Sequence, residues 1–159
     1  MNLFTTKTLK LTLILSFFTL GSFSQPTFFK QFGGSGTIDK FHDIKATSDG
    51  GYVTVGFTNS YGAGSLDIYI MKFNASDVVQ WSRTIGGTST EYGHSIVQTS
   101  DGGYAVAGWT SSYGAGTADF YIVKLNSAGV VQWTRTVGGT GTDVAYSIVQ
   151  TADGGYAIG

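Results

Sequence analysis

Short runs in which apolar residues alternate with small or polar ones, separated by glycine-rich turns, fill most of this chain. Alternation over runs of this length predicts β-strands. From His94 to Val137 the pattern predicts four of them, at residues 95–99, 104–110, 119–125 and 130–137. Asp101-Gly102-Gly103 separates the first two runs, and glycine supplies the positive φ that a tight hairpin requires. We therefore expect a small antiparallel sheet of four strands.

Both faces of this predicted sheet are apolar. On the second strand, one face carries Ala105, Ala107 and Trp109, and the other carries Tyr104, Val106 and Gly108. A sheet with one solvated face would alternate apolar and polar residues instead. We therefore expect each sheet to be covered on both sides by neighbouring sheets.

The pattern repeats along the chain with a period of 52 residues. WSRTIGG at residues 81–87 returns as WTRTVGG at 133–139, and Asp-Gly-Gly-Tyr begins at Asp49, Asp101 and Asp153. We divide the repeats into units that span residues 28–80, 81–132 and, in part, 133–159. A fixed period in this range is typical of repeat architectures, in which each unit buries its apolar surface against the next.

Radial stacking of four-stranded sheets gives a β-propeller. We predict an all-β propeller of 52-residue, four-stranded antiparallel blades, here an incomplete array of about two and a half units preceded by a fourth strand at residues 28–32. A β-sandwich or a β-solenoid is the alternative, although the unit is long for a solenoid coil. An incomplete array leaves open sheet edges. We expect either further blades of a longer polypeptide or self-association of several copies to close the ring.

Three motifs carry a resemblance to a known class of repeat. They are W-x-R-T-x-G-G-T, S-I-V-Q-T-x-D-G-G-Y and G-x-T-x-S-Y-G-A-G-x-x-D-x-Y-x-x-K. Residues 28–159 resemble the glycine-rich β-propeller repeats, of the bacterial SBBP kind, found in large exported cell-surface proteins. The resemblance implies a secreted or surface-displayed propeller with no assigned enzymatic activity, often followed by adhesive modules and a sorting domain. Unit 1 departs from the pattern, with Phe28 where the others have Trp81 and Trp133.

Residues 1–24 are predicted to be a signal peptide, and residues 25–159 to carry the repeats. Lys7 and Lys10 precede an apolar run, and Ser22 and Ser24 stand at the spacing that a signal peptidase recognises. The run is short for a membrane span, so we expect no membrane anchor in the mature chain. The predicted location is periplasmic, cell-surface or extracellular. The chain has no Cys, which excludes disulfides, thiolate metal sites and lipid attachment at a cysteine.

Charge and composition argue against nucleic acid as a partner. Removal of residues 1–24 leaves seven basic and ten acidic residues, a net charge of about −3, with no basic patch. Aromatic residues make up 14% of the chain and charged residues only 12%, which is typical of a tightly turned all-β protein and unlike a disordered segment.

The histidines are weak candidates for chemistry. His42 and His94 occupy equivalent positions, but the third unit has Tyr146 there, so we interpret all three as polar aromatic residues of the fold. The sequence also contains no Gly-x-Ser-x-Gly elbow and no His-Glu-x-x-His segment. We predict no catalytic residues, no metal and no cofactor, and a protein that is not an enzyme.

Most acidic residues recur with the repeat, which favours structural roles. Asp49, Asp101 and Asp153 open the Gly-Gly turns and are predicted to bond their own backbone there. A second acidic position follows each Gly-Gly-Thr-type loop, at Asp39, Glu91 and Asp143. We interpret it as a carboxylate that accepts loop N–H bonds, with a calcium ligand as the alternative.

The candidate ligand-binding residues lie between the second and third strands. Tyr61 and Tyr113 stand in Ser-Tyr-Gly-Ala-Gly loops, where exposed aromatic faces could hold sugar rings in several weak, equivalent sites. The alternative is that each tyrosine packs against the neighbouring blade. Asp67 and Asp119, which open the third strand, are the other candidates, and they could instead tie the loop down.

These observations favour a secreted or surface-displayed repeat module for protein or glycan interaction, without catalysis, within a larger adhesin-like protein. Two alternatives stay open. One is a short-chain lectin that forms its propeller by oligomerisation, and the other is a fragment of a propeller enzyme such as a glycoside hydrolase.

Overall fold

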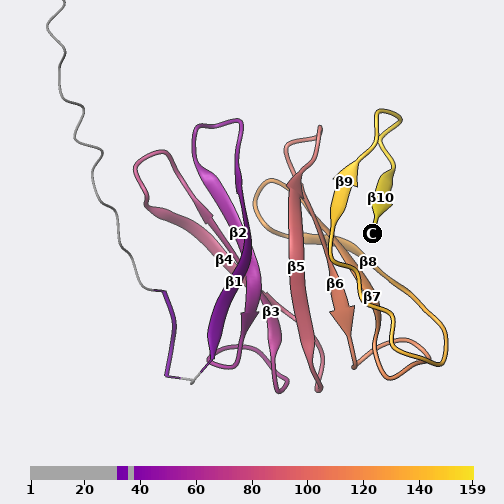
Figure 1. Ribbon diagram of the computed structural model, residues 1–159. Helices are drawn as coiled ribbons and strands as arrows, with labels where there is room; N and C mark the ends of the chain where they lie inside the picture. The colour runs from indigo at the N-terminus through magenta and orange to yellow at the C-terminus, as the bar shows by residue number, and fades with distance from the viewer. Residues whose placement is uncertain (1–31, 36–37) are drawn as a thin grey trace, which may run out of the picture. The chain divides into compact units, whose positions relative to one another are not determined.

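The computed structural model describes residues 32–35 and 38–159, which form two four-stranded antiparallel sheets and a hairpin (Figure 1). The sheets have the strand orders β1-β2-β3-β4 and β5-β6-β7-β8, and β9 pairs with β10. The strands are β1 (Asp39–Ala46), β2 (Tyr52–Thr58), β3 (Asp67–Phe73), β4 (Val79–Ile85), β5 (Glu91–Gln98), β6 (Tyr104–Thr110), β7 (Asp119–Leu125), β8 (Val131–Val137), β9 (Ile148–Gln150) and β10 (Tyr156–Ile158). The predicted signal peptide and nearly all of the predicted strand at residues 28–32 lie outside the described residues. The described residues include no helix with the length and hydrophobicity of a membrane span.

The strands of the second sheet follow the sequence pattern closely, with one exception. β6 and β7 have the predicted bounds, and β8 begins at Val131, one residue later than predicted. β5 begins at Glu91, well before the predicted start at Ser95. A bulge between Gly93 and Ser95 leaves His94 out of the pairing with β6. The irregularity interrupts the alternation of side chains, so the pattern reveals only the second half of the strand.

One hydrogen-bond pattern recurs in the three Asp-Gly-Gly turns. In the first, Asp49 Oδ1 accepts hydrogen bonds from Thr47 Oγ1 at 2.6 Å and from Gly51 N at 3.1 Å. The same bonds recur around Asp101 and Asp153. Each carboxylate therefore fixes the turn through a contact two residues along the chain on either side.

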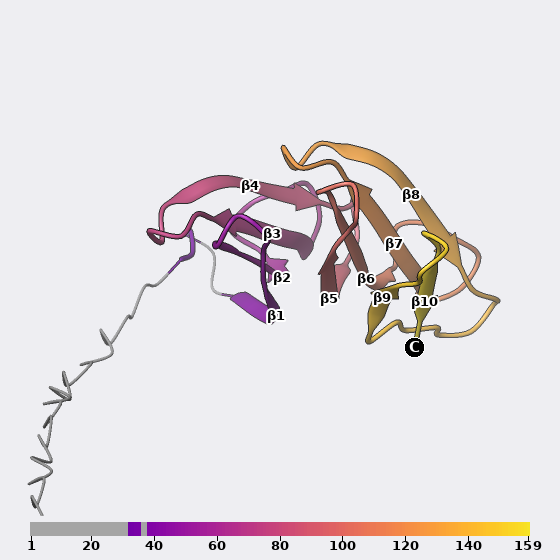
Figure 2. The same ribbon diagram turned by 90° about the horizontal axis from the view of Figure 1, so that it is seen from above.

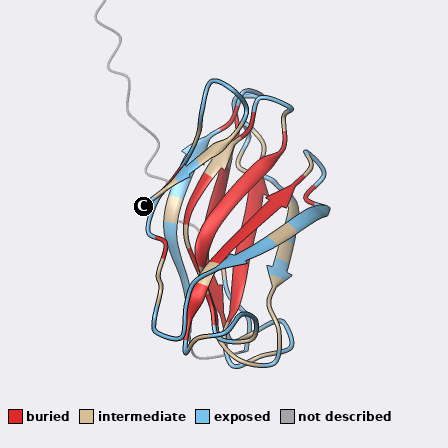
Figure 3. Ribbon diagram, turned by 90° about the vertical axis from the view of Figure 1, so that its right-hand side faces the viewer, coloured by how far each residue is buried: buried red, intermediate tan, exposed pale blue. Residues whose placement is uncertain are grey.

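Apolar side chains stack the sheets face to face. A cluster between the first and second sheets includes Val53, Ile70 and Val106, all fully buried. A second cluster, with Ala105 and Ile148, lies between the second sheet and the β9–β10 hairpin. Figure 3 shows buried residues along the central strands, and β2, β3, β6 and β7 are mostly buried. The edge strands β1, β4 and β8 are largely exposed, as are most loops and turns. The middle sheet is thus covered on both faces, as its composition predicts.

Successive sheets are arranged as neighbouring blades of a propeller. The first strands β1, β5 and β9 lie on one side, and the fourth strands β4 and β8 lie on the other (Figure 2). Side chains tie each blade to the next at equivalent positions, since Gln98 Oε1 accepts a hydrogen bond from Ser48 N and Gln150 Oε1 accepts one from Ser100 N, both at 2.8 Å. The fold is therefore an all-β array of partial propeller blades, and the described sheets do not close a ring.

Candidate functional site

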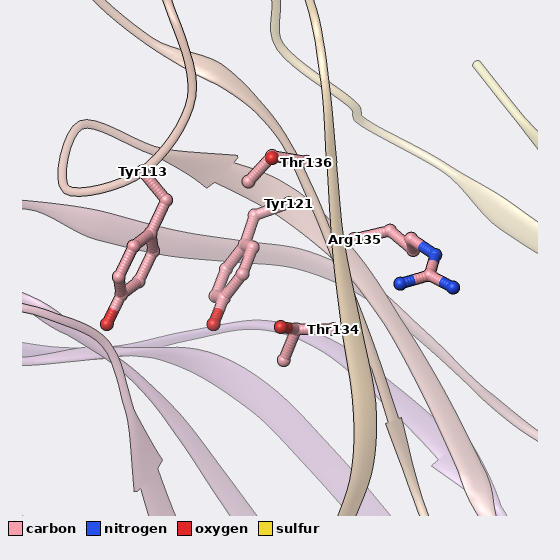
Figure 4. Close-up of a pocket in the computed structure, with 5 residues that line it drawn as sticks. All are labelled: Tyr113, Tyr121, Thr134, Arg135 and Thr136. Carbon is pink, nitrogen blue, oxygen red and sulfur yellow. The ribbon is translucent and has the colours of Figure 1, made fainter.

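A pocket of about 480 Å³ opens beside the last strand of the second blade. It is lined by Tyr113 from the loop between β6 and β7, by Tyr121 from β7, and by Thr134, Arg135 and Thr136 from β8. Figure 4 shows the two tyrosine rings side by side near the two threonines, whereas the Arg135 side chain points away from the rings. The ring centroids are 5.7 Å apart, and the ring planes are inclined by 34°.

The first blade has the same pocket at equivalent positions. Its lining residues are Tyr61, Tyr69, Ser82, Arg83 and Thr84, and its volume is about 320 Å³. The two tyrosine centroids are again 5.7 Å apart, with an inclination of 34°. We call these two sites the tyrosine pockets. They recur because the loop, the third strand and the fourth strand of both blades share one sequence pattern.

The loop that carries each exposed tyrosine wraps around a buried aspartate. Asp67 Oδ2 accepts hydrogen bonds from two loop amides, at 3.1 and 3.0 Å. Gly62 has a φ of 105°, and a Cβ there would lie 2.1 Å from Asp67 Oδ2, so the loop requires glycine at this position. Asp119 holds the second loop through Gly116 N at 3.0 Å. The structure thus places Asp67 and Asp119 beneath the loops and not among the residues that line the tyrosine pockets.

The two tyrosines of a pocket differ in exposure. Tyr61 and Tyr113 are 46% and 45% exposed, whereas Tyr69 and Tyr121 are buried. Burial raises the pKa of Tyr69 and of Tyr121 above the ordinary phenol value, so both hydroxyls stay protonated at neutral pH. Tyr113 Oη also donates a hydrogen bond to Gly86 O of the preceding blade at 3.3 Å. Tyr113 therefore belongs to the second blade and is hydrogen-bonded to the first, while its side chain stays largely accessible to solvent.

The chemistry of the tyrosine pockets suits a neutral ligand that carries hydroxyl groups. Each pocket combines two aromatic rings with two serine or threonine hydroxyls, and neither is lined by a carboxylate or a histidine. Aromatic faces pack against apolar ligand surface, and hydroxyls both donate and accept hydrogen bonds. An open site with so few polar groups would hold a single ligand weakly, and a second equivalent site would raise the avidity for a ligand that reaches both.

Three rings lie in a row across the blades, with His42 on β1, His94 on β5 and Tyr146 just before β9. The centroids of His42 and His94 are 5.1 Å apart with nearly parallel planes, and those of His94 and Tyr146 are 5.0 Å apart. His42 Nδ1 lies 3.1 Å from Gly93 O. Burial, and then the neighbouring His42, lower the pKa of His94 below its ordinary value. Over residues 32–35 and 38–159, no three His, Cys, Asp or Glu side chains gather where they could hold a metal ion.

The carboxylates that follow the Gly-Gly loops also contact the loop backbone. Each accepts a hydrogen bond from a glycine N–H, in the pairs Gly34 and Asp39 at 3.1 Å, Gly87 and Glu91 at 2.8 Å, and Gly139 and Asp143 at 2.9 Å. Glu91 is fully buried and accepts a further bond from Thr110 Oγ1 at 2.6 Å. The three carboxylates therefore accept hydrogen bonds from loop N–H groups, as the structural interpretation of this acidic position predicts.

Sequence reasoning missed half of each tyrosine pocket. Tyr69 and Tyr121 stand among apolar residues on the third strand, so the sequence pattern does not distinguish them from core residues. The signal was present, because Asp-x-Tyr recurs with the 52-residue period together with serine or threonine on both sides of Arg83 and Arg135. The repeated Lys72 and Lys124, buried beside the Asp-Gly-Gly turns, were also missed.

The chain is distantly similar to a known regulatory protein. No protein-family model matches the chain. The chain is 24% identical over 140 residues to the Regulatory protein FlaEY of Caulobacter vibrioides. The matched region covers 80% of this chain and 14% of that protein, so the chain spans about a seventh of the relative's length.

Proposed function

We propose that this chain is an exported, non-catalytic binding module that presents its tyrosine pockets to glycans, within a larger adhesin-like protein. The recurrence of the tyrosine pocket carries this proposal. The same residue types and the same ring geometry stand at equivalent positions in both complete blades. A catalytic group is needed once, whereas a repeated open pocket suits a ligand that is itself repeated.

A saccharide ring matches the chemistry of the tyrosine pocket. The exposed ring of Tyr113 would pack against the apolar face of the sugar, and the hydroxyls of Thr134 and Thr136 would exchange hydrogen bonds with its hydroxyls. Arg135 is the one charged residue of the lining, and it points away from the tyrosine rings (Figure 4). A neutral saccharide is therefore favoured over an anionic one.

The sequence signal for export and the repetition of the pocket support the same function. The pattern of Lys7, Lys10 and the apolar run after them is typical of a secretory signal, which would bring the module into contact with surface glycans. Because each pocket would hold a single sugar weakly, we expect the natural ligand to carry several identical residues.

A glycan array probed with the full-length chain tests this proposal, followed by calorimetric titration of the strongest ligand. We expect two equivalent sites in the chain. Replacing both exposed tyrosines, Tyr61→Ala with Tyr113→Ala, should weaken binding by roughly tenfold or more, because the aromatic faces are lost. The matched pair Tyr61→Phe with Tyr113→Phe should bind within about threefold of the wild type, because the rings stay.

Thermal melts of each variant control for folding, since Tyr113 Oη also bonds Gly86 O. Tyr113→Ala alone should halve the number of sites and leave the affinity of the other unchanged. If no glycan is retained, or if the double alanine variant binds as the wild type does, the tyrosine pockets are not glycan sites and the proposal fails.

A further inference from the structure

A second kind of pocket, of about 350 Å³, lies between the first and second blades. The tyrosine pocket of the first blade borders the loop that follows β2, whereas this pocket borders the turn that precedes β2. We call it the interblade pocket, and its walls come from the two four-stranded sheets and their turns. It is lined by Ser48, Asp49, Lys72, Gln80 and Trp81 from the first blade and by Gln98, Gly102, Tyr104 and Ser127 from the second.

Tyr104 presents a hydroxyl without a hydrogen-bond partner to the interblade pocket. The residue is only 2% exposed, and its hydroxyl bonds no described residue. Among the described residues, no side-chain polar atom that lacks a partner is fully shielded from solvent, so the hydroxyl opens into the pocket. Burial, and then the charge of Asp49, raise the pKa of Tyr104 to about 12, so the hydroxyl is a protonated donor close to that carboxylate. A buried polar group without a partner in the fold points to a ligand.

The equivalent tyrosine of the first blade is satisfied within the fold. The Tyr52 hydroxyl is hydrogen-bonded to the Asp77 carboxylate, which raises the pKa of Tyr52 after burial has done so. In the second blade the position of Asp77 is taken by Gly129, which has no side chain to offer Tyr104. The free hydroxyl is therefore a property of the interblade pocket and not of the repeat as such.

Two glutamine side chains turn further donors toward the ligand space. Gln80 Oε1 accepts a hydrogen bond from Lys72 Nζ at 3.0 Å, and Gln98 Oε1 accepts one from Ser48 N at 2.8 Å. The Nε2 amino groups of both glutamines bond no described residue. Each amide is thus held through its oxygen while its amino group stays available as a donor.

The acceptor of the interblade pocket is the Asp49 carboxylate, whose side chain is 48% exposed. Lys72 balances its charge, but the ammonium is engaged by Asp49 Oδ2, Phe73 O and Gln80 Oε1. One cation and one anion are the charged residues of the lining, so the pocket has no net charge. A neutral ligand is therefore favoured over an ion.

The wall that carries Ser127 is fixed in place by the first blade. Arg83 Nε donates a hydrogen bond to Gly129 O at 2.8 Å, and Arg83 Nη2 donates one to Ala128 O at 3.1 Å. The Gly129 backbone also lies against the Trp81 indole, so closely that a Cβ there would be 2.8 Å from ring carbons. Because both blades hold the walls in place, a ligand would pay little to organise the interblade pocket.

We propose that the interblade pocket binds the acetamido group of an N-acylated sugar. The acetamido oxygen accepts hydrogen bonds from the Tyr104 hydroxyl and the Gln98 amino group, and the acetamido N–H donates one to the Asp49 carboxylate. An amide carries an acceptor and a donor side by side without a net charge, which matches donors gathered around one carboxylate. The hydroxyls of Ser48 and Ser127 exchange hydrogen bonds with the sugar ring, and the volume is that of a site for one small molecule. The inference does not depend on binding at the tyrosine pockets.

Two methyl glycosides that differ in one group test this assignment. Methyl N-acetyl-β-glucosaminide carries the acetamido group, and methyl β-glucoside has a hydroxyl in its place. Each is titrated into the full-length chain and followed by NMR. We expect saturable binding of the acetamido sugar and roughly tenfold weaker binding of the glucoside, because two or more hydrogen bonds are lost. The difference should persist in the chain with Tyr61→Ala and Tyr113→Ala, where the tyrosine pockets no longer contribute.

Two conservative variants identify the site. Tyr104→Phe keeps the ring and removes the hydroxyl, so the acetamido sugar should bind about fivefold more weakly. Gln98→Glu keeps the oxygen that Ser48 N bonds but replaces the free amino group with an acceptor, so the loss should be roughly tenfold. Tyr52→Phe is the matched control and should change the affinity by less than about twofold, because Tyr52 does not line the interblade pocket.

Thermal melts control for folding. Because the Tyr104 hydroxyl has no partner among the described residues, Tyr104→Phe should not lower the melting temperature, and a clear fall would contradict the free hydroxyl. Equal affinity for the two glycosides, absence of saturable binding, or binding unchanged by both Tyr104→Phe and Gln98→Glu would each overturn the proposal. Tighter binding of N-acetylglycinamide than of the acetamido sugar would also overturn it, because the pocket would then recognise a peptide amide.

Discussion

Lys72 Nζ lies 2.8 Å from Asp49 Oδ2, and the lysine side chain is 3% exposed while the aspartate side chain is 48% exposed. The ammonium donates its other hydrogen bonds to Phe73 O at 2.7 Å and to Gln80 Oε1 at 3.0 Å. The second blade repeats the arrangement with Lys124 and Asp101. A buried cation needs a charged partner, and here the hairpin turn supplies it. The turn between the first two strands and the side chain of the third are therefore mutually dependent.

Removing the turn carboxylate should destabilise a complete blade more than the third unit. Asp49→Ala leaves the buried Lys72 ammonium without its carboxylate, so we expect the free energy of unfolding to fall by about 2 kcal/mol. Asp153→Ala is the matched control, because it removes the same turn contacts where no described lysine is present. Urea unfolding followed by tryptophan fluorescence measures both. Equal losses would show that the ion pair contributes nothing beyond the turn itself.

The same carboxylates make stability sensitive to acid. Hydrogen bonds, from Lys72 first for Asp49 and from Thr99 first for Asp101, hold the pKa of both groups well below the usual value of 3.8. A depressed pKa in the folded state stabilises the fold fully above the unfolded pKa, and this contribution is lost as the pH falls below it. We expect the urea midpoint to change little between pH 7 and 5 on account of these groups and to drop below about pH 4. Asp49→Asn with Asp101→Asn should make that drop shallower, and an unchanged drop would contradict this origin.

The strands were predictable where packing follows strict alternation. β6 and β7 have the predicted bounds, because both are buried on two faces and end at glycine-rich turns. β5 was predicted only in part, since the bulge at His94 shifts its register and hides the alternation. The stacking of the sheets followed from apolar residues on both faces, which is a property of composition and survives small errors in strand bounds.

Only the loop residues of the candidate site could be predicted from the sequence. Tyr61 and Tyr113 were recognisable because an aromatic residue in a glycine-rich loop lies outside the predicted strands and their core. Tyr69 and Tyr121 read as core residues, and only the register of β3 against β4, and of β7 against β8, brings them beside the exposed tyrosines and the fourth-strand hydroxyls. Asp67 was a candidate ligand-binding residue because the sequence does not say on which side of the loop its carboxylate lies, and the structure places it on the inner side.

The stacked rings predict a second pH dependence at higher pH. Burial first, and then His42, lower the pKa of His94 from its ordinary value of 6.5, so the folded state favours the neutral imidazole. The unfolded chain binds the proton more readily, and the contribution of His94 to stability is therefore complete above about pH 6.5 and is lost as the pH falls below it. His94→Tyr, which introduces the residue found at Tyr146, should remove this loss. Melting temperatures between pH 8 and pH 5 measure this loss of stability. If the variant loses as much stability as the wild type, His94 is not the group responsible.

Two different constraints could require glycine at position 129, the positive φ of the turn and the close contact with the Trp81 indole. Its φ is 73°, yet Asp77 adopts a φ of 60° at the equivalent turn of the first blade, so the turn alone does not require glycine. Asparagine tolerates this region of φ better than most residues, and Gly102, with a φ of 79° and no atom near its Cβ position, should accept Gly102→Asn at a cost of about 1 kcal/mol or less. Gly129→Asn should instead lower the free energy of unfolding by about 1–3 kcal/mol, because its Cβ meets the Trp81 indole. Urea unfolding of the two variants makes the comparison, and similar losses would mean that packing against the Trp81 indole does not require glycine at position 129.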